Sequence, residues 1–263
     1  MNLLGRIALL GSGALLACSS SSSANPAAAA DASSPGDSHD GGGGAEAAVA
    51  DLPTCGAPPY VTLGIVVRAA SAGGNGAVIA GAKLTTSLCP GTLRLSGDDG
   101  VIRGRVSKGV PFFARFEATS YVPTLISEQQ FDADKDPIVA PLPPSLFTAL
   151  VPGYDATKAA IVVGVTKDGG SGPCAALDGV SFQVEGHPEA KVTYFTADAI
   201  PAATTGTTTT LAGRAVITGL PNVPLVTLTG TKTGCTVTFL KAPYTGRAPL
   251  EAGFLTLAPA YLH

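Results

Sequence analysis

Residues 97–107 read Gly-Asp-Asp-Gly-Val-Ile-Arg-Gly-Arg-Val-Ser, a turn followed by an alternating strand. Gly and Asp favour tight turns, because Gly accepts a positive φ and the Asp side chain bonds the local backbone. After the turn, Arg103 and Arg105 alternate with the apolar Ile102 and Val106. Successive side chains of a strand point to opposite faces. This stretch therefore predicts a β-sheet with one face in water and one face in the core.

The same alternation, interrupted by Gly and Pro, recurs from Leu52 to the C-terminus and predicts two sets of short strands. The first set comprises residues 61–68, 82–88, 93–96, 101–107, 112–118 and 123–127. The second set comprises residues 159–166, 180–185, 191–195, 214–218, 225–230, 236–240 and 253–258. So many short strands are typical of β-sandwiches. We therefore expect an all-β chain with two tandem antiparallel Greek-key β-sandwiches after a disordered N-terminal tether.

The two sets of strands are similar to each other in sequence. Gly100 precedes Val110-Pro111 by the same spacing as Gly213 precedes Val223-Pro224. Two shorter matches lie upstream, and they join residues 64–67 to 160–163 and residues 81–84 to 179–182. A tandem duplication explains these matches, and chance similarity between two β sequences is the alternative.

Four strings of the first set follow one another in a family-like order: Ile-Ala-Gly-Ala-Lys-Leu at 79–84, Gly-Asp-Asp-Gly at 97–100, Val-Pro-Phe-Phe at 110–113 and Ser-Tyr-Val-Pro at 120–123. Together they resemble the carboxypeptidase regulatory-like domain. The resemblance covers about residues 60–130 and, more weakly, residues 159–240. It implies a transthyretin-like (prealbumin-like) β-sandwich, and the family has no catalytic residues to carry over.

The N-terminus has the pattern of an export signal. Arg6 precedes a largely apolar run from Ile7 to Leu16, which as a helix rises only about 15 Å, half of what a bilayer span needs. The run ends in Leu-Leu-Ala-Cys, which resembles the lipobox of bacterial lipoproteins. That resemblance implies that residues 1–18 are a lipoprotein signal peptide and lipobox, and that Cys18 carries the lipid. An ordinary secretory peptide cut near Ala17 is the alternative.

The residues after Cys18 predict a flexible, disordered linker. Residues 19–51 are rich in Ser, Ala and Gly, contain no aromatic residue, and cannot bury enough surface to offset the entropy of ordering. A coil of this length averages about 30 Å between its ends, which holds a folded part clear of the lipid. Ser19 stands where a sorting Asp would be, so the lipoprotein resemblance implies the outer membrane.

The rest of the chain divides into three segments. Residues 52–136 are expected to form β-sandwich domain 1, and residues 159–263 β-sandwich domain 2. The connector, residues 137–158, begins with four prolines up to Pro144, which keep it extended and unable to pair as a central strand. Ser145 is then expected to cap a short helix.

Two of the remaining four cysteines fall in each expected domain. Export favours disulfides, and four cysteines allow three connectivities. Pairing within each domain keeps the domains self-contained and is the expectation, Cys55 with Cys89 and Cys174 with Cys235. Zinc is the rival ligand, but the chain has no Cys-x-x-Cys pair, and only His187 lies near a cysteine in sequence. We therefore expect no metal site.

Other candidate groups for chemistry favour simpler interpretations. His187 lies between Glu185 and Glu189, where a solvated turn residue is favoured over a metal ligand or a catalytic base. A surface loop is likewise favoured over a calcium site for the alternating carboxylates, because prolines stand where an EF-hand needs Gly and Glu. Those carboxylates are Asp132, Asp134 and Asp136.

Composition and motifs argue against several classes of function. The formal net charge is −3 with no basic cluster, so nothing marks a nucleic-acid binder. Motifs for a serine nucleophile, a phosphate loop or a zinc protease do not occur in the sequence. We expect a non-enzymatic, lipid-anchored envelope protein with a structural or binding role, no cofactor, and an envelope protein or a glycan as partner. The alternative is a carbohydrate- or peptide-binding accessory module of an envelope hydrolase or transport system, with an aromatic site drawn from Tyr60, Tyr121, Tyr154 and Tyr244.

Overall fold

The computed structural model describes residues 52–70, 76–167, 171–197, 202–239 and 247–263. Every regular element in these ranges is a β-strand or a short 3-10 helix, which confirms the predicted all-β class. The predicted signal peptide, Cys18 and the predicted linker lie outside the described residues.

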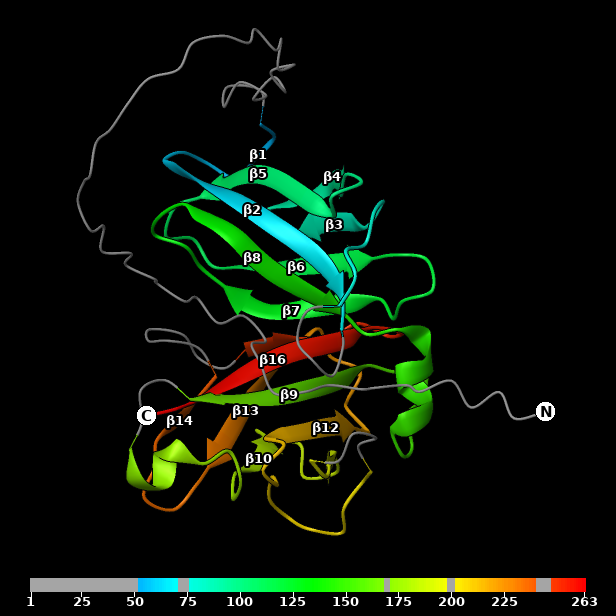
Figure 1. Cartoon of the computed structure of the whole chain (residues 1–263), viewed down its shortest axis with the longest axis vertical. Helices are drawn as coiled ribbons and strands as arrows, with labels where there is room; N and C mark the ends of the chain where they lie inside the picture. The colour runs from blue at the N-terminus through cyan, green and yellow to red at the C-terminus, as the bar shows by residue number, and fades with distance from the viewer. Residues whose placement is uncertain (1–51, 71–75, 168–170, 198–201, 240–246) are drawn as a thin grey trace, which may run out of the picture.

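The first half of the chain, residues 52–142, is a sandwich of two layers (Figure 1). One layer has the strand order β1-β5-β2-β8, formed by Thr54–Cys55 (β1), Val101–Ser107 (β5), Tyr60–Ala69 (β2) and Lys135–Leu142 (β8). The facing layer has the order β4-β3-β6-β7, formed by Cys89–Leu95 (β4), Lys83–Thr86 (β3), Phe112–Glu117 (β6) and Thr124–Gln129 (β7). Ile102 and Val106 are buried between the layers and Arg103 is exposed, as the alternation predicts.

The second half, residues 159–263, has a similar arrangement. One layer has the order β11-β12-β9-β16, formed by Lys191–Tyr194 (β11), Arg214–Thr218 (β12), Ala160–Lys167 (β9) and Leu255–Leu262 (β16). The facing sheet has the order β10-β13-β15, formed by Ser181–Val184 (β10), Leu225–Thr231 (β13) and Arg247–Pro249 (β15). The short strand Val237–Thr238 (β14) pairs with the end of β16. The 3-10 helices are Ser145–Leu150 (η2) and Gly172–Ala175 (η3).

A buried hydroxyl ties β3 to the turn before β5 in the first half. Ser96 Oγ accepts a hydrogen bond from the backbone N–H of Ala82 at 2.8 Å and donates one to the carbonyl of Ile79 at 2.7 Å. The backbones also exchange bonds, since Ser96 N–H donates to the carbonyl of Ala82 and Gly81 N–H donates to that of Ser96. One side chain thus satisfies a donor and an acceptor that have no strand partner.

The same device occurs in the second half. Thr209 Oγ1 accepts from the N–H of Val180 at 2.9 Å and donates to the carbonyl of Leu177 at 2.7 Å, and Gly179 N–H donates to the carbonyl of Thr209. Ser96 and Thr209 therefore occupy equivalent positions. Aligning the two halves on these residues matches Gly100 with Gly213, as the sequence matches predict. The two halves therefore share the same local structure over these segments, as a tandem duplication predicts.

One sequence match needs correction. Val67 N–H donates to the carbonyl of Gly100 at 2.9 Å, and Val165 N–H donates to the carbonyl of Gly213 at 2.7 Å. The equivalent of Val67 is therefore Val165, so the match between residues 64–67 and 160–163 is wrong by two residues. A shift of two leaves every side chain on the same face of its strand, and the apolar pattern alone does not detect it.

The last strand, β16, joins the two halves into one sheet (Figure 1). All of β16 pairs with β9, and Leu255–Leu257 pairs with Thr124–Ile126 of β7, both in parallel. The larger sheet therefore runs β11-β12-β9-β16-β7-β6-β3-β4. The pairs β2–β8 and β1–β5 are parallel as well. The sandwich arrangement is confirmed, but the expectation of purely antiparallel sheets is wrong at these pairs, because alternation does not encode strand direction.

The proline-rich start of the predicted connector forms an edge strand of the first half. The carbonyl of Leu142 accepts a hydrogen bond from the backbone N–H of Ala70, at the end of β2, so the backbone groups of Leu142 face β2. Those of the preceding residue, Pro141, face away from β2, where a missing N–H breaks no hydrogen bond of the sheet. The helix η2 follows, but Pro144 is its N-cap residue and no side chain caps it, so the predicted Ser145 cap is wrong. The domain boundary at residues 137–158 stays a prediction.

We predict that Thr209→Val destabilises the protein by about 1 to 3 kcal/mol, because the buried N–H of Val180 loses its acceptor at nearly constant side-chain volume. Thr209→Ser keeps the hydroxyl, as Ser96 does in the first half, and should cost less than half as much. The measurement is the urea midpoint. Thr208→Val is the matched control, since Thr208 is exposed; equal losses for Thr208→Val and Thr209→Val contradict the role of the hydroxyl.

Candidate functional site

Both predicted disulfides are present, and each lies within one half. Cys55 and Cys89 join β1 to β4 with a Cα–Cα distance of 5.3 Å, and Cys174 and Cys235 join η3 to the turn before β14 with a distance of 5.4 Å. Since β1 has only two residues and pairs with β5 alone, the first disulfide secures it to the opposite layer.

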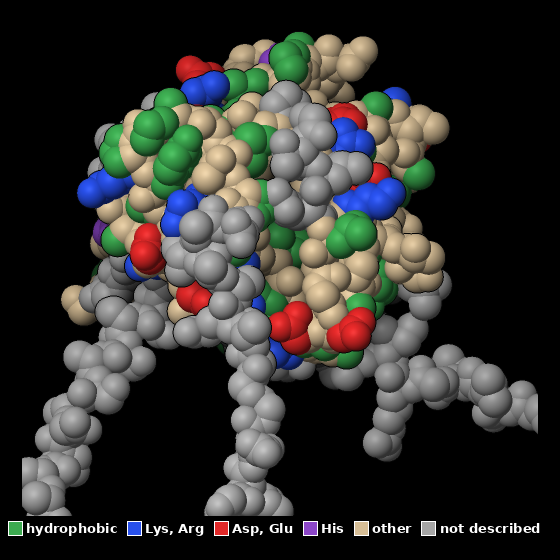
Figure 2. All heavy atoms as spheres, turned by 90° about the horizontal axis from the view of Figure 1, so that it is seen from above, with side chains coloured by type: hydrophobic (Ala, Val, Ile, Leu, Met, Phe, Trp, Pro, Cys, Tyr) green, Lys and Arg blue, Asp and Glu red, His purple; other side chains and the backbone are tan. Residues whose placement is uncertain are grey.

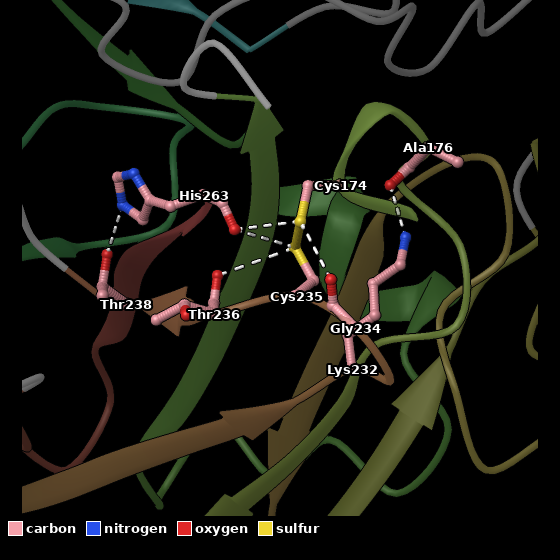
Figure 3. Close-up of a disulfide and its surroundings, with 8 residues drawn as sticks. All are labelled: Cys174, Ala176, Lys232, Gly234, Cys235, Thr236, Thr238 and His263. Atoms are coloured by element: carbon pink, nitrogen blue, oxygen red, sulfur yellow. Dashed lines mark hydrogen bonds between the residues drawn. A yellow bond between two sulfur atoms is a disulfide. The ribbon is translucent and has the colours of Figure 1, made fainter. Parts of the chain in front are cut away.

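The second disulfide lies against the C-terminus of the described chain (Figure 3). The carbonyl oxygen of His263 is 2.9 Å from Cys174 Sγ and 3.4 Å from the other sulfur; oxidised sulfur has no proton, so these are contacts rather than hydrogen bonds. Lys232 Nζ donates to the carbonyl of Ala176 at 2.6 Å, and Thr236 exchanges two backbone bonds with His263. These contacts fix β14 against the end of β16.

The tyrosines predicted as an aromatic site do not gather in one place. Tyr60 begins β2, whereas Tyr121 forms a bridge just beyond the far end of the parallel strand β8. A strand as long as β2 spans about 30 Å. Tyr154 packs with Tyr121 against the first core, and burial, followed by the charge of Asp155, raises the pKa of Tyr154. Tyr244 lies outside the described residues. The described tyrosines therefore give no support to a shared sugar-binding surface.

The alternating carboxylates serve separate structural contacts. Asp134 accepts a hydrogen bond from the backbone N–H of Thr62 at 2.8 Å, and Asp136 lies 3.9 Å from the guanidinium of Arg103. Asp136 already belongs to β8, so only part of the segment is the predicted surface loop. Among the described residues, no group of three or more His, Cys, Asp or Glu is placed to hold a metal ion.

A polar hollow of about 500 Å³ lies between the segment before β9 and the ends of β11 and β12. Lys158, Lys191 and Asp155 line it. Hydrogen bonds from the side chain and backbone of Thr157 lower the pKa of Asp155, and Lys158 lies 3.8 Å from that carboxylate. Because its charged side chains are exposed and of both signs, this hollow offers no fixed charge pattern to a ligand.

A second hollow, of about 550 Å³, lies on the side of the second half where β10 and β11 are the outermost strands. Phe182, Gln183 and Val184 line it from β10, Val192 lines it from β11 and Thr229 from β13, and Glu185 and His187 line it from the turn between β10 and β11. The side chains of Phe182 and Val184 belong to the second core. We call it the β10–β11 hollow. Its lining is polar and apolar in similar measure, and Gln183, Glu185, His187 and Thr229 are the polar residues.

The chemistry of His187 is that of a turn residue, as predicted. His187 Nδ1 lies 3.1 Å from a carboxylate oxygen of Glu189, and the pKa of Glu189 is lowered first by a bond from its own backbone and then by His187. Within the described residues, no hydroxyl or thiol makes a hydrogen bond with His187. The imidazole therefore has no nucleophile to activate.

Tyr194 spans the interior between β11 and β10. Its hydroxyl accepts a hydrogen bond from the backbone N–H of Phe182 at 3.0 Å, and its ring lies against that of Phe182 with centroids 6.3 Å apart. Burial raises the pKa of Tyr194 although this hydrogen bond acts in the opposite direction. A neutral phenol therefore occupies a hydrogen-bonding position that a neighbouring strand would otherwise fill.

Sequence reasoning missed the β10–β11 hollow, although a signal for it was present. Residues 87–88 connect β3 to β4, whereas residues 185–190 connect β10 to β11. The longer connection, which contains Gly186 and Pro188, crosses from one layer to the other. The repeat alignment shows this difference in length, but not which sheet the following strand joins.

The outer surface carries charges of both signs. Figure 2 shows Lys and Arg side chains interspersed with Asp and Glu on the face of the first half that it views, without a single-sign patch. In the part of the chain that the structure describes, no helix has the length and apolar character needed to cross a bilayer.

Comparison with known proteins gives only distant similarity. No family model and no curated protein sequence matches the chain. Among solved structures, the TIE protein of Bacillus anthracis is similar with a TM-score of 0.26 and 11% identity over 78% of this chain and 34% of that one. The shaft pilin SpaA of Lactobacillus rhamnosus GG has a TM-score of 0.24 and 9% identity over 78% of this chain and 98% of that one. The major pilin T-13 of Streptococcus pyogenes has a TM-score of 0.19 and 8% identity over 78% of this chain and 96% of that one. With TM-scores this low, nothing about function follows from the likeness.

We predict that replacing Cys174 and Cys235 together by Ser lowers the free energy of unfolding by roughly 3 to 4 kcal/mol, because the disulfide closes a long loop of the unfolded chain. Urea denaturation measures the loss, and thiol alkylation followed by mass spectrometry counts free cysteines. The double Ser variant of Cys55 and Cys89 is the control for a shorter loop and should lose slightly less. Free Cys174 or Cys235 in the unreduced chain contradicts the pairing.

Proposed function

We propose that this chain is a lipid-anchored protein of a bacterial envelope, with the anchor at Cys18 and a structural or binding role for its β-sandwich body. The observation that carries the proposal is the pair of disulfides, Cys55–Cys89 and Cys174–Cys235. Disulfides persist in oxidising compartments outside the cytoplasm, and they agree with the export signal and lipobox of residues 1–18.

The fold is consistent with a non-enzymatic β-sandwich body attached to the membrane through a flexible linker. The linker, residues 19–51, supplies about 30 Å of reach as a flexible coil. Beyond it, β16 binds both halves into one sheet, so they present their surfaces in a fixed relation to each other. Such a body suits scaffolding or recognition of another envelope component. Ser19 after the lipobox favours the outer membrane as the place of anchoring.

The candidate second function is a peptide- or carbohydrate-binding accessory module. One observation supports it and another argues against its carbohydrate-binding form. The β10–β11 hollow is large enough for part of an extended ligand. The described tyrosines, in contrast, do not form the aromatic platform on which sugars stack. Peptide binding is therefore the form of this alternative that the geometry favours.

We predict that Cys18→Ser moves the protein from the membrane fraction to the soluble fraction of a Gram-negative expression host and removes the mass of the acyl chains. Several acyl chains on one residue bind a membrane almost irreversibly, whereas the unlipidated chain lacks that hydrophobic attachment. Fractionation, immunoblotting and intact mass measure the outcome. Ser20→Ala is the control and should stay in the membrane.

Ser19→Asp tests the place of anchoring separately, because it keeps the lipid and should redirect the protein from the outer to the inner membrane. If Cys18→Ser fractionates like the parent chain, the anchor at Cys18 is wrong. If both chains are in the soluble fraction, the ordinary secretory peptide is correct.

A further inference from the structure

The β10–β11 hollow lies at the position that a strand occupies in the first half. β3 and β10 are equivalent, since Ala82 and Val180 at their starts share the same buried hydroxyl bond. Along the outer edge of β3, the first half places β4, with Lys83 opposite Leu95 and Leu84 opposite Arg94. In the second half the chain leaves β10, crosses to the other layer and pairs with β12 as β11. The hollow therefore adjoins a strand edge whose counterpart is paired.

Two backbone groups of β10 point into this side without a partner in the described residues. Glu185 N–H donates to the carbonyl of Thr227 in β13, so Val184 and Phe182, one and three residues earlier, direct their backbone groups to the opposite edge. The hydroxyl of Tyr194 accepts the hydrogen bond of Phe182 N–H, and the carbonyl of Val184 accepts one from the backbone N–H of His187 in the turn. The carbonyl of Phe182 and the N–H of Val184 remain.

The edge of β11 contributes a second pair of backbone groups. Phe195 N–H donates to the carbonyl of Arg214 in β12, so Val192 points its N–H and carbonyl outward, toward the hollow that it lines. Farther along this edge, Phe195 and Ala203 form an isolated β-bridge, and Thr204 N–H donates to the carbonyl of Tyr194 at 2.8 Å. The edge of β11 thus accepts a neighbouring segment where the chain supplies one.

The side chains around the hollow define the chemistry of an added segment. Val184 and Val192 offer apolar contacts to side chains that point inward, as alternate residues of a strand do. Glu185 at the rim makes no ion pair within the described residues. An exposed carboxylate beside an open strand edge is complementary to a Lys or Arg on the outward side of the segment.

We propose that the β10–β11 hollow binds an extended peptide segment of a partner protein by strand addition, with alternating apolar and basic residues and a basic side chain opposite Glu185. The segment takes the place relative to β10 that β4 takes relative to β3. Main-chain bonds to the carbonyl of Phe182 and the N–H of Val184 provide affinity, and the alternating side chains provide selectivity. The proposal rests on the binding role proposed above but is independent of the lipid at Cys18.

The test titrates the purified full chain with a short blocked peptide of alternating Val and Lys, and with the matching Val and Glu peptide. Fluorescence anisotropy measures affinity, and amide hydrogen exchange reports the site. We expect the Val–Lys peptide to slow exchange at the N–H of Val184 by at least about tenfold at saturation. A peptide N-methylated on the pairing edge should not bind, because it lacks the backbone donors.

Glu185→Lys should weaken binding of the Val–Lys peptide by about fivefold or more and improve binding of the Val–Glu peptide. Asp98→Lys makes the same charge change on an exposed turn of the first half and should alter neither affinity. Loss of affinity in both variants, binding without slower exchange at Val184, slower exchange there with an oligosaccharide instead of the peptides, or no saturable binding overturns the proposal. None of these results bears on whether Cys18 anchors the chain.

Discussion

The burial of β16 on both faces and its pairing on both edges hold the two halves together. Leu255 and Leu257 belong to the first core, while Ala258, Ala260 and Leu262 belong to the second. Full burial of a Leu side chain contributes about 1.5 to 3 kcal/mol, so the strand stabilises both cores at once. Its partners in β7 are more than a hundred residues away in sequence, and such non-local pairing makes folding slow. Loss of this strand would separate two sheets that share no other ladder in the described residues.

Ion pairs across the junction orient the halves but add little energy. Arg115 of β6 lies 2.7 Å from Glu251 and stacks over the ring of Phe254 at 4.2 Å, while Arg247 of β15 lies 3.0 Å from Glu128 of β7. Each half thus supplies one cation and one anion. Exposed pairs contribute about 0 to 1 kcal/mol. The Glu128 carboxylate is buried, so it depends on its partner, and this pair contributes more to specificity of alignment than to net stability.

Local signals in the sequence predicted most of the strands, the Gly100 turn and the pairing of cysteines, because each depends on residues within one half. They did not predict β1, β8 or β15. The role of β16 was not predictable in this way. The apolar run Leu255–Leu262 indicates a buried strand, but it does not indicate which strands pair with it. The two-residue error at Val165 has the same origin, since strand periodicity repeats every two residues. The β10–β11 hollow was missed because it arises from the sheet that β11 joins, which depends on contacts between distant segments.

The lengths of two connections explain how the copies diverged. Stacked sheets lie about 10 Å apart, and residues 87–88 are too few to cross that distance and reverse, so β4 returns beside β3, where Cys89 is held to Cys55. Residues 185–190 suffice for the crossing, and β11 extends the opposite sheet. The edge of β10 then needs another partner, and Tyr194 supplies one through its hydroxyl oxygen. Side chains satisfy a strand edge without filling the space beside it. The first half is therefore closed on this side by β4, whereas β10 is the outermost strand of its sheet in the second half.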